Sequence, residues 1–526
     1  MRRKAMSLIL GVMVLAAMSG CARQPAAPAL EDTLIIGSSQ EPTTLDPAIV
    51  YDGSDRITRL IYESLLDYVG STAEVQAHLA TDWRVSPDGK VYTFELRDDV
   101  QFHDGTPFNA EAVKFSFDRM TKIAKGMSWA FRMVLAEVKV TAEYTVEFHL
   151  KKPYPGFLGM VANRYAAPII SPSIMQHEKD GDLAQGWAHD NAIGTGPYKL
   201  VNWTKKQELT LVKNDDYWRG WPQKHISRVV YKILPDSATQ RMMLERGDIH
   251  TATHIGIDDI IVLMDHPEIR IEPAPTSNFN WFLLLNTQKG VFADRRLREA
   301  LSWAFPYDET VRHVFRGQAT QSVGPVPFGV PGHEPDLFQY HRDLDRAKAL
   351  MAAAGYPNGG FKVTITHGDN DWARKILEMT ISTLGELGIT AETKPLVWGA
   401  MLDNMASQDT APDIVVADWW DDYPDPDAFL GGMADAFWWG GREAADYFYV
   451  NPEVQDLLGE AAFEADPARR VDLYRRAQEL MVADCPGVWI MDYLYATPFR
   501  KNVYGYVANP YYIMSYNVYG MWIEAR

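Results

Sequence analysis

The spacing of apolar residues along the chain predicts alternating strands and helices. A short apolar run, TLIIGSS (33–39), predicts a buried strand, and apolar residues three and four apart predict a helix that continues through YESLL (62–66). VYTFEL and TVEFHL alternate apolar with polar residues, which is typical of half-buried strands. Asn109 stands at a favourable N-cap position for a helix that reaches about Met120.

A more regular α/β alternation begins near residue 278. Apolar spacing predicts helices at 345–354 and 376–387, while FKVTIT and ITAET read as strands and a short helix follows Trp398. The unbroken apolar run DIVVA (413–417) predicts a buried strand of a mostly parallel sheet. Together these segments predict the α/β fold class.

The stretch WWDDYPDP (419–426) follows DIVVA directly and combines two indoles with several carboxylates. A core favours tryptophan without aspartate, and a solvated loop favours the reverse, whereas a site for a ligand with an apolar body and a positive charge uses both. Ligands of open α/β sheets bind outside the carboxyl ends of strands. Pro424 and Pro426 restrict the loop's backbone and reduce the cost of ordering it. We therefore expect a ligand site here.

The first residues have the layout of an export signal. A basic start and an apolar stretch at 5–17 precede two small residues and Cys21, which resembles the lipobox of bacterial lipoproteins except for Met18. Lipidation of Cys21 is expected, with 22–30 as a tether; the alternative is ordinary signal cleavage beside a chance cysteine. Cys485 is the only other cysteine, so the mature chain has no intramolecular disulfide.

Length and charge narrow the class of protein. A chain of 526 residues is too long for one hydrophobic core, so two or three domains are expected. The formal charge is −18, and −21 without the three basic residues of the leader. Such a surface repels nucleic acid and anionic lipid headgroups and favours cationic ligands.

The motifs of common enzymes are missing from the sequence. It contains no GxSxG, GxxxxGK[ST] or HExxH motif and no pair of CxxC motifs, and its thirteen histidines are scattered. The aspartates at 418–427 lack the ligand spacing and the turn glycine of a calcium loop. Paired carboxylates also occur in glycosidases, but any acidic loop offers them. We expect no metal, no cofactor and no catalytic residue.

Several longer segments, in order, resemble one family. They are EPTTLDP, YESLL, DGKVYTFELRDDVQFHDGTPFNAEAVKFSFDR, GTGPYKL, NDDYW, LLLNTQKGVFADRRLREALSWAF, AKALMAAAGYPNGG, DYPDPDAFL and NPEVQDLL. The chain resembles the dipeptide/oligopeptide-type (family 5) extracellular solute-binding proteins of bacterial ABC importers. AFPYDE departs from the family, which usually has an Asn- or Asp-Arg pair there.

The resemblance implies a periplasmic-binding-protein-like fold, with two hinged α/β lobes, an extra α+β domain and the ligand enclosed between the lobes. It implies a monomer without enzymatic activity that docks on a membrane permease, in the periplasm or at the cell surface, held to the membrane only through Cys21. The implied ranges are 1–21 (signal peptide), 22–30 (tether), 31–66, 190–283 and 496–526 (lobe I), 67–189 (domain II) and 284–495 (lobe III).

The resemblance also implies site residues. Asp422 matches the aspartate of a D-Y-x-(D/E)-P motif that pairs with a peptide's α-ammonium; the alternative is a turn cap. Trp419 and Trp420 flank it, and strand alternation makes one of them a core residue. From lobe I, the loop after LDP is expected to contact ligand through Tyr51, Asp52 and Gly53.

Arg374, in NDWARK, matches the arginine that holds the C-terminal carboxylate in dipeptide binders; an exposed helical arginine is the alternative. Trp372 in the same stretch is expected to line the site. Trp398 matches a tryptophan that the family often retains, in the site or in packing.

A dipeptide or short peptide is the expected ligand, because the arginines that oligopeptide-type members carry before the D-Y motif are missing. The same transport role for an oligosaccharide, opine, glutathione or nickel chelate stays open. A secreted hydrolase or a peptide sensor is the alternative from a different class.

Overall fold

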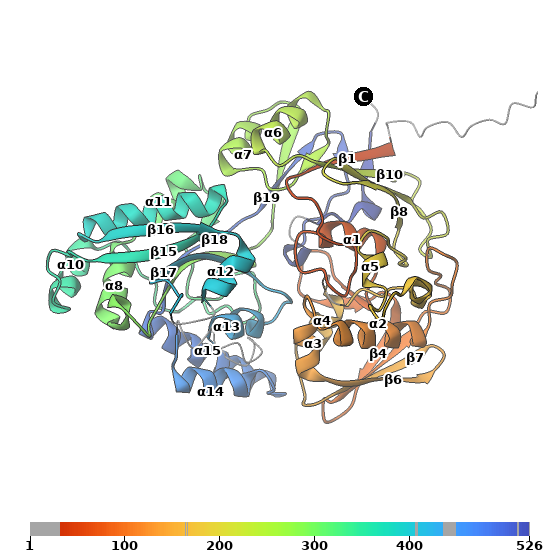
Figure 1. Ribbon diagram of the computed structural model, residues 1–526, viewed down its shortest axis with the longest axis horizontal. Helices are drawn as coiled ribbons and strands as arrows, with labels where there is room; N and C mark the ends of the chain where they lie inside the picture. Colours follow the sequence, from red (N-terminus) through yellow and green to blue (C-terminus); the bar gives the residue numbers. More distant parts are fainter. Residues whose placement is uncertain are drawn as a thin grey trace, which may run out of the picture.

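The computed structural model describes residues 32–163, 165, 167–405, 409–434, 449–512 and 515–524. Three larger sheets organise this part of the chain, with seven, six and four strands (Figure 1). We call the parts built on them lobe I, lobe III and domain II. Cys21, the leader and the tether lie outside the described residues, so lipidation stays a prediction. Among the described residues, no helix has both the length and the apolar content to cross a bilayer.

Lobe I is assembled from three separate stretches of sequence around a seven-stranded sheet. Its strands, in spatial order, are β12 (Ile269–Pro273), β19 (Ala496–Arg500), β11 (Thr251–Ala252), β1 (Thr33–Ser38), β10 (Arg228–Ile233), β9 (Glu208–Lys213) and β8 (Tyr198–Thr204). The predicted strand at 33–39 is therefore confirmed as β1, which pairs in parallel with β10 and β11. Its helices are α1 (Asp55–Ile61), α6 (Ser237–Arg246) and α7 (Ile257–Met264).

Helix α1 is shorter than predicted, because it ends at Ile61 and YESLL is not helical. The Gly196 amide donates to the Ile61 carbonyl at 2.9 Å, and Tyr62 takes an extended conformation. A Cβ on Gly196 would lie 2.7 Å from that carbonyl, so only glycine allows this approach. A partner distant in sequence thus ends the helix before its apolar pattern does.

Lobe III contains the six-stranded sheet. Its strands, in spatial order, are β14 (Ala319–Thr320), β18 (Gly487–Tyr493), β13 (Phe279–Leu285), β17 (Ile414–Trp420), β15 (Lys362–Gly368) and β16 (Thr390–Leu396). Its main helices are α8 (Arg295–Ala304), α10 (Leu344–Ala353), α11 (Asp371–Glu386), α12 (Trp398–Met405), α13 (Pro426–Ala434), α14 (Pro452–Ala461) and α15 (Pro467–Asp484).

The prediction of a mostly parallel sheet around DIVVA is wrong. Strand β17 runs parallel to β15 on one side but antiparallel to β13 on the other, and β13, β18 and β14 pair antiparallel. An apolar run reports burial on both faces of a strand, and both faces of this mixed sheet are covered. The apolar run therefore does not predict whether the adjacent strands are parallel or antiparallel to it.

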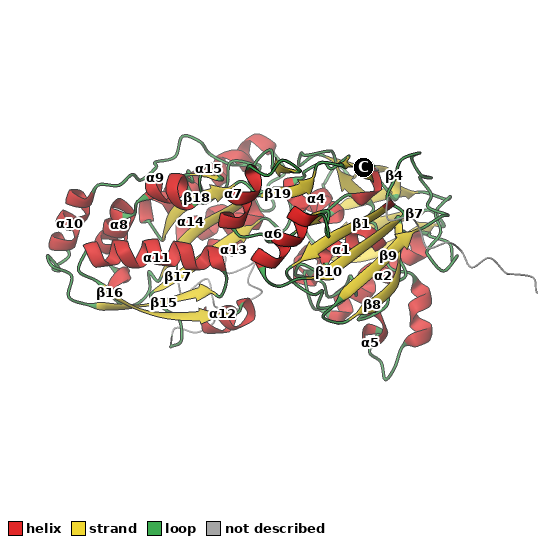
Figure 2. Cartoon of the chain, turned by 90° about the horizontal axis from the view of Figure 1, so that it is seen from above, coloured by secondary structure: helices red, strands yellow, loops and turns green. Residues whose placement is uncertain are grey.

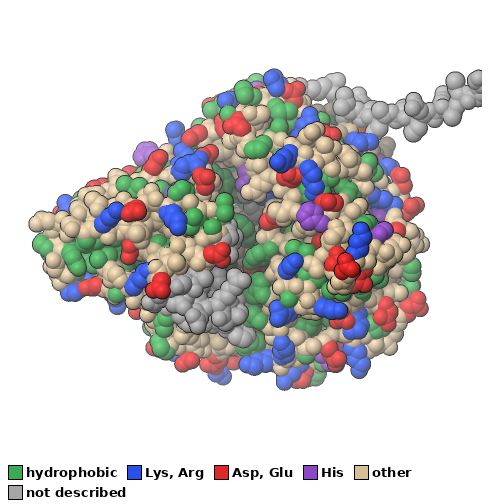
Figure 3. Space-filling view, viewed as in Figure 1, with side chains coloured by type: hydrophobic (Ala, Val, Ile, Leu, Met, Phe, Trp, Pro, Cys, Tyr) green, Lys and Arg blue, Asp and Glu red, His purple; other side chains and the backbone are tan. Residues whose placement is uncertain are grey.

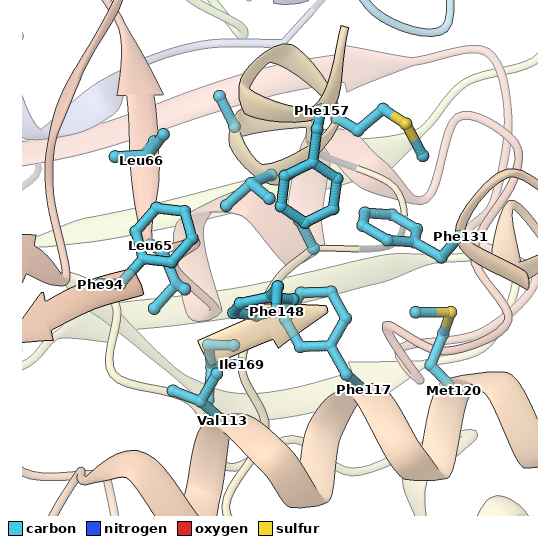
Figure 4. Close-up of a cluster of buried hydrophobic side chains, with 14 of the residues drawn as sticks. Leu65, Leu66, Phe94, Val113, Phe117, Met120, Phe131, Phe148, Phe157 and Ile169 are labelled. Carbon is cyan, nitrogen blue, oxygen red and sulfur yellow. The ribbon is translucent and has the colours of Figure 1, made fainter. Parts of the chain in front are cut away.

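Domain II holds the four-stranded antiparallel sheet and a core of aromatic side chains. Its sheet order is β4 (Ala80–Val85), β5 (Val91–Leu96), β7 (Thr145–Leu150) and β6 (Leu135–Ala142), with helices α2 (Ala110–Ile123), α3 (Ser128–Val134) and α4 (Phe157–Ala162). Asn109 accepts from the Ala112 amide at 3.1 Å, which confirms the predicted N-cap. Phe117 of α2 meets Phe148 of β7 edge to face at 4.8 Å (Figure 4).

Two crossing segments join lobe I to lobe III. One connects β12 with β13, the other connects β18 with β19, and the Ala274 amide of the first donates to the Tyr495 carbonyl of the second at 2.7 Å. Figure 2 shows the two sheets on either side of this junction, and Figure 3 shows a hollow between the lobes. The expected boundary at 283/284 falls inside β13; the division into domains otherwise stays a prediction.

Candidate ligand-binding site

The two tryptophans of WWDDYPDP belong to strand β17, which extends through Trp420. The Trp419 indole nitrogen donates to the Ala428 carbonyl at 3.1 Å, and its ring packs on the core beneath the sheet. Trp420 is 38% exposed and stacks on Phe279 at 5.9 Å. The strand's pleat therefore separates them, with Trp419 in packing and Trp420 available to a ligand.

Asp422 and Tyr51 meet across the two lobes. The Tyr51 hydroxyl donates to Asp422 Oδ2 at 2.9 Å, and the Asp422 residue is 6% exposed. Burial and the adjacent Asp422 charge raise the pKa of Tyr51 well above its usual value, so the phenol stays neutral and donates. The Asn163 side-chain amide of domain II donates to the backbone carbonyl of Asp422. Residues of all three parts of the fold thus meet at Asp422, with Tyr51 on its carboxylate and Asn163 on its backbone.

The other aspartates of the motif hold the loop in place. Tyr154 of domain II donates to Asp427 Oδ2 at 3.0 Å, and its hydroxyl lies 2.9 Å from that of Tyr423. The Arg470 guanidinium pairs with Asp425 at 2.8 Å. Burial is the main reason that the pKa values of Tyr154 and Tyr423 rise well above the usual range, so both stay neutral. Sequence reasoning missed this network because Tyr154 lies far away along the chain.

Arg374 is placed at the start of α11 but is engaged in ion pairs of its own. It is half exposed and pairs with Asp369 at 3.0 Å and with Asp371. These two carboxylates already offset its charge, and its role toward a ligand carboxylate stays a prediction. Trp372 packs on Tyr493, with ring centroids 5.0 Å apart.

The remaining predicted residues sit at the edges of the site. Asp52 accepts from the Thr43 hydroxyl at 2.7 Å and from the Ser54 amide at 2.9 Å, which shapes the loop that carries Tyr51. A Cβ on Gly53 would lie 3.2 Å from the Arg56 guanidinium carbon, so a glycine at this position leaves room for the Arg56 side chain. Trp398 begins α12, and its side chain lies outside the description.

An aromatic wall that sequence reasoning missed lies at the junction of the lobes. Tyr493 of β18 contacts Phe279 at 6.2 Å and Tyr495 at 6.2 Å, and the Tyr495 hydroxyl accepts from the His254 amide of lobe I at 3.1 Å. Burial, reinforced by the charge of Arg56, lowers the pKa of His254 well below its usual value, so this histidine stays neutral. The runs FNWFLLL and GVWIMDY were the available signal, because both read as buried strands.

Two α/β lobes joined by paired crossing segments, with residues of both meeting at a buried carboxylate, define a two-lobed solute-binding protein of the periplasmic-binding-protein type. Comparison with known proteins agrees with this class. The family model for bacterial extracellular solute-binding proteins, family 5 (middle region), matches residues 74–441. The chain belongs to this family, which confirms the resemblance seen in its sequence.

Individual relatives cover nearly the whole chain. The probable D,D-dipeptide-binding periplasmic protein DdpA of Escherichia coli K12 is 34% identical over 93% of this chain and 94% of its own length. The glutathione-binding protein GsiB of Shigella dysenteriae is 27% identical over 95% of each chain. The Helicobacter pylori periplasmic binding protein DppA, solved with the peptide STSA, superposes with a TM-score of 0.81 at 29% identity, covering 94% of this chain and 98% of its own.

Proposed function

We propose that this chain binds a dipeptide or short peptide outside the cytoplasm, between lobes I and III, and delivers it to an ABC importer permease. The observation that carries the proposal is the buried Asp422 carboxylate, which receives the Tyr51 hydroxyl from the opposite lobe. A carboxylate so placed can bind an α-ammonium by a charge-assisted hydrogen bond while the phenol satisfies a further lone pair. The peptide-binding relatives support the same ligand class.

The proposal places ligand between Trp420 and the Tyr51 loop. Trp420 presents an exposed indole face beside Asp422, which suits an apolar side chain or a cation next to the ammonium. The protein would act as a monomer without enzymatic activity, tethered through a lipid on Cys21. A membrane fraction that keeps the wild-type chain and loses a Cys21→Ser variant would support the anchor.

Native mass spectrometry tests the ligand class. The purified chain is weighed before and after unfolding, and released short peptides are the expected result. A single mass that belongs to one of the alternative ligands, namely glutathione, an opine, an oligosaccharide or a nickel chelate, would keep the transport role and replace the ligand. Turnover of a bound peptide by the pure chain would instead support the hydrolase alternative.

A double-mutant cycle tests the role of Asp422. Asp422→Asn and N-terminal acetylation of the peptide should each weaken binding by about 2–4 kcal/mol, since each leaves one buried partner without its counter-charge. Together they should weaken binding little more than either alone. Full additivity, measured by calorimetry, would show that the two groups do not meet.

A further inference from the structure

Asp418 is a carboxylate in the wall of the site that the proposed α-ammonium contact does not use. It lies on β17 directly opposite Trp281 of β13. Side chains two apart on a strand point to the same face, so Asp418 shares the face of Trp420 and lies opposite to the face where Trp419 packs. Phe279 completes this face, in contact with both Trp281 and Trp420. Asp418 therefore borders the exposed indole rather than the core under Trp419.

Within the part of the chain that the structure describes, no basic side chain supplies a counter-charge for Asp418. No lysine, arginine or histidine of the described residues forms an ion pair with it, whereas Asp425, seven residues on, has Arg470 at 2.8 Å. Burial raises the pKa of Asp418 to about 7, and no neighbouring cation opposes that shift. A half-buried carboxylate without a cation is costly to ionise. A cation brought by a ligand would remove that cost.

Trp281 supplies an independent indication of a ligand. Its indole nitrogen is a buried donor, the residue is 1% exposed, and no hydrogen-bond partner for the nitrogen is found in the part of the chain that the structure describes. Buried donors are almost always satisfied in native proteins. An acceptor, Asp418, and a donor, Trp281, thus stand side by side on one face. A peptide offers the complement, with a carbonyl acceptor next to a cationic side chain.

The separation of Asp418 from Asp422 suits a short peptide. Asp422 comes four positions after Asp418, so their Cα atoms are at most about 14 Å apart. A residue of extended peptide spans about 3.5 Å, so a lysine or arginine one or two residues along from the α-ammonium brings its side-chain cation within that reach. The net charge of −18 also favours the approach of cations.

We propose that Asp418 forms a second anionic subsite, and that the ligand is a short peptide with a lysine or arginine side chain that this carboxylate binds. The inference rests on the proposed function, in which Asp422 binds the α-ammonium. It narrows the ligand from peptides in general to basic peptides.

Calorimetry on the purified full chain tests the subsite with four dipeptides: Ala-Lys, Lys-Ala and the two counterparts in which norleucine replaces lysine. Norleucine keeps the apolar stem and removes the cation. At least one lysyl peptide should bind at least about tenfold more tightly than its counterpart, as expected for a hydrogen-bonded charge pair. Asp418→Asn should reduce that preference, the ratio of lysyl to norleucyl affinity, to within about twofold.

Asp308→Asn is the matched control, because this aspartate of lobe III has a side chain that is 77% exposed and its loss changes the net charge equally. The control should keep the full lysine preference. Equal affinity of the wild-type chain for lysyl and norleucyl peptides, which requires no variant, would overturn the subsite and leave the peptide function standing. A lysine preference that survives in Asp418→Asn would also overturn it. Binding of none of the four peptides would overturn both the subsite and the proposed ligand class.

Discussion

Replacing Tyr154 by phenylalanine should weaken ligand binding although Tyr154 is outside the proposed ligand contacts. Tyr154 belongs to domain II, and its hydroxyl joins Tyr423 at 2.9 Å and Asp427 at 3.0 Å in lobe III. Domain II is attached to lobe I through the buried pair of Arg119 with Asp46, at 2.6 Å. If lobe III opens away from lobe I while domain II stays with lobe I, the Tyr154 contacts must break. They therefore stabilise only the closed arrangement.

The magnitude follows from the two hydrogen bonds. Since Tyr154 donates to Asp427, the Tyr423 hydroxyl must donate to Tyr154, and phenylalanine removes both bonds. A bond to a carboxylate contributes about 1.5–3 kcal/mol and a neutral one about 1 kcal/mol, so closure loses roughly 2.5–4 kcal/mol. If the free protein is mainly open, ligand affinity falls by the same free energy, at least about tenfold even after water replaces part of the loss.

Calorimetry with a co-purifying peptide measures the loss, and Tyr198→Phe is the matched control. The buried Tyr198 hydroxyl donates to the Ile226 carbonyl at 3.0 Å, entirely within lobe I. This control should lower the free energy of unfolding by about 1 kcal/mol without changing affinity. Affinity within twofold of wild type for Tyr154→Phe would refute the reasoning, because closure would then not depend on domain II.

Two further predictions concern stability, each measured by urea unfolding. Arg119→Met should cost about 3–5 kcal/mol because it leaves Asp46 buried without its cation, whereas Arg84→Met, at an exposed pair, should cost less than about 1 kcal/mol; similar losses would contradict this. Burial raises the pKa of Asp492 to about 7, so its contribution to stability is present below pH 4 and is lost as pH rises towards 7. As pH rises from 4.5 to 7.5, the free energy of unfolding of Asp492→Asn should therefore increase relative to that of the wild type, by about 1.4 kcal/mol per pKa unit of the shift. A difference between the two proteins that stays constant with pH would refute the prediction.

Local elements could be predicted where the determining groups are close in sequence. The Asn109 cap of α2 lies next to the helix it begins, and Gly388 takes the left-handed conformation that ends the predicted helix now seen as α11. The end of α1 could not be predicted, because it depends on Gly196, more than a hundred residues away. Whether the neighbours of β17 run parallel or antiparallel to it could not be predicted either, because the apolar residues of a strand depend on its burial and not on the direction of the neighbouring strands.

The same distinction applies to the aspartates around WWDDYPDP. In the sequence they form one acidic stretch, and only the resemblance to the family's D-Y-x-(D/E)-P motif distinguishes Asp422 from Asp425 and Asp427. The structure separates them by their distant partners: Arg470 neutralises Asp425, and Tyr154 binds Asp427. Asp422 instead accepts a hydrogen bond from the Tyr51 hydroxyl of the opposite lobe, and the proposed ligand would bind beside this contact.

The pleat of β17 also determines which of these residues pack in the core and which face the proposed site. It turns Trp419 into the core and leaves Asp418 and Trp420 on one face, where no cation of the described residues pairs with Asp418. The loop's position after a strand was enough to predict a ligand site, since ligands of open α/β sheets bind outside the carboxyl ends of strands. Which of its charges bind ligand depends on which ones the rest of the protein has already neutralised. That assignment requires the tertiary structure, because Arg470 and Tyr154 are far from the loop in sequence and adjacent to it in space.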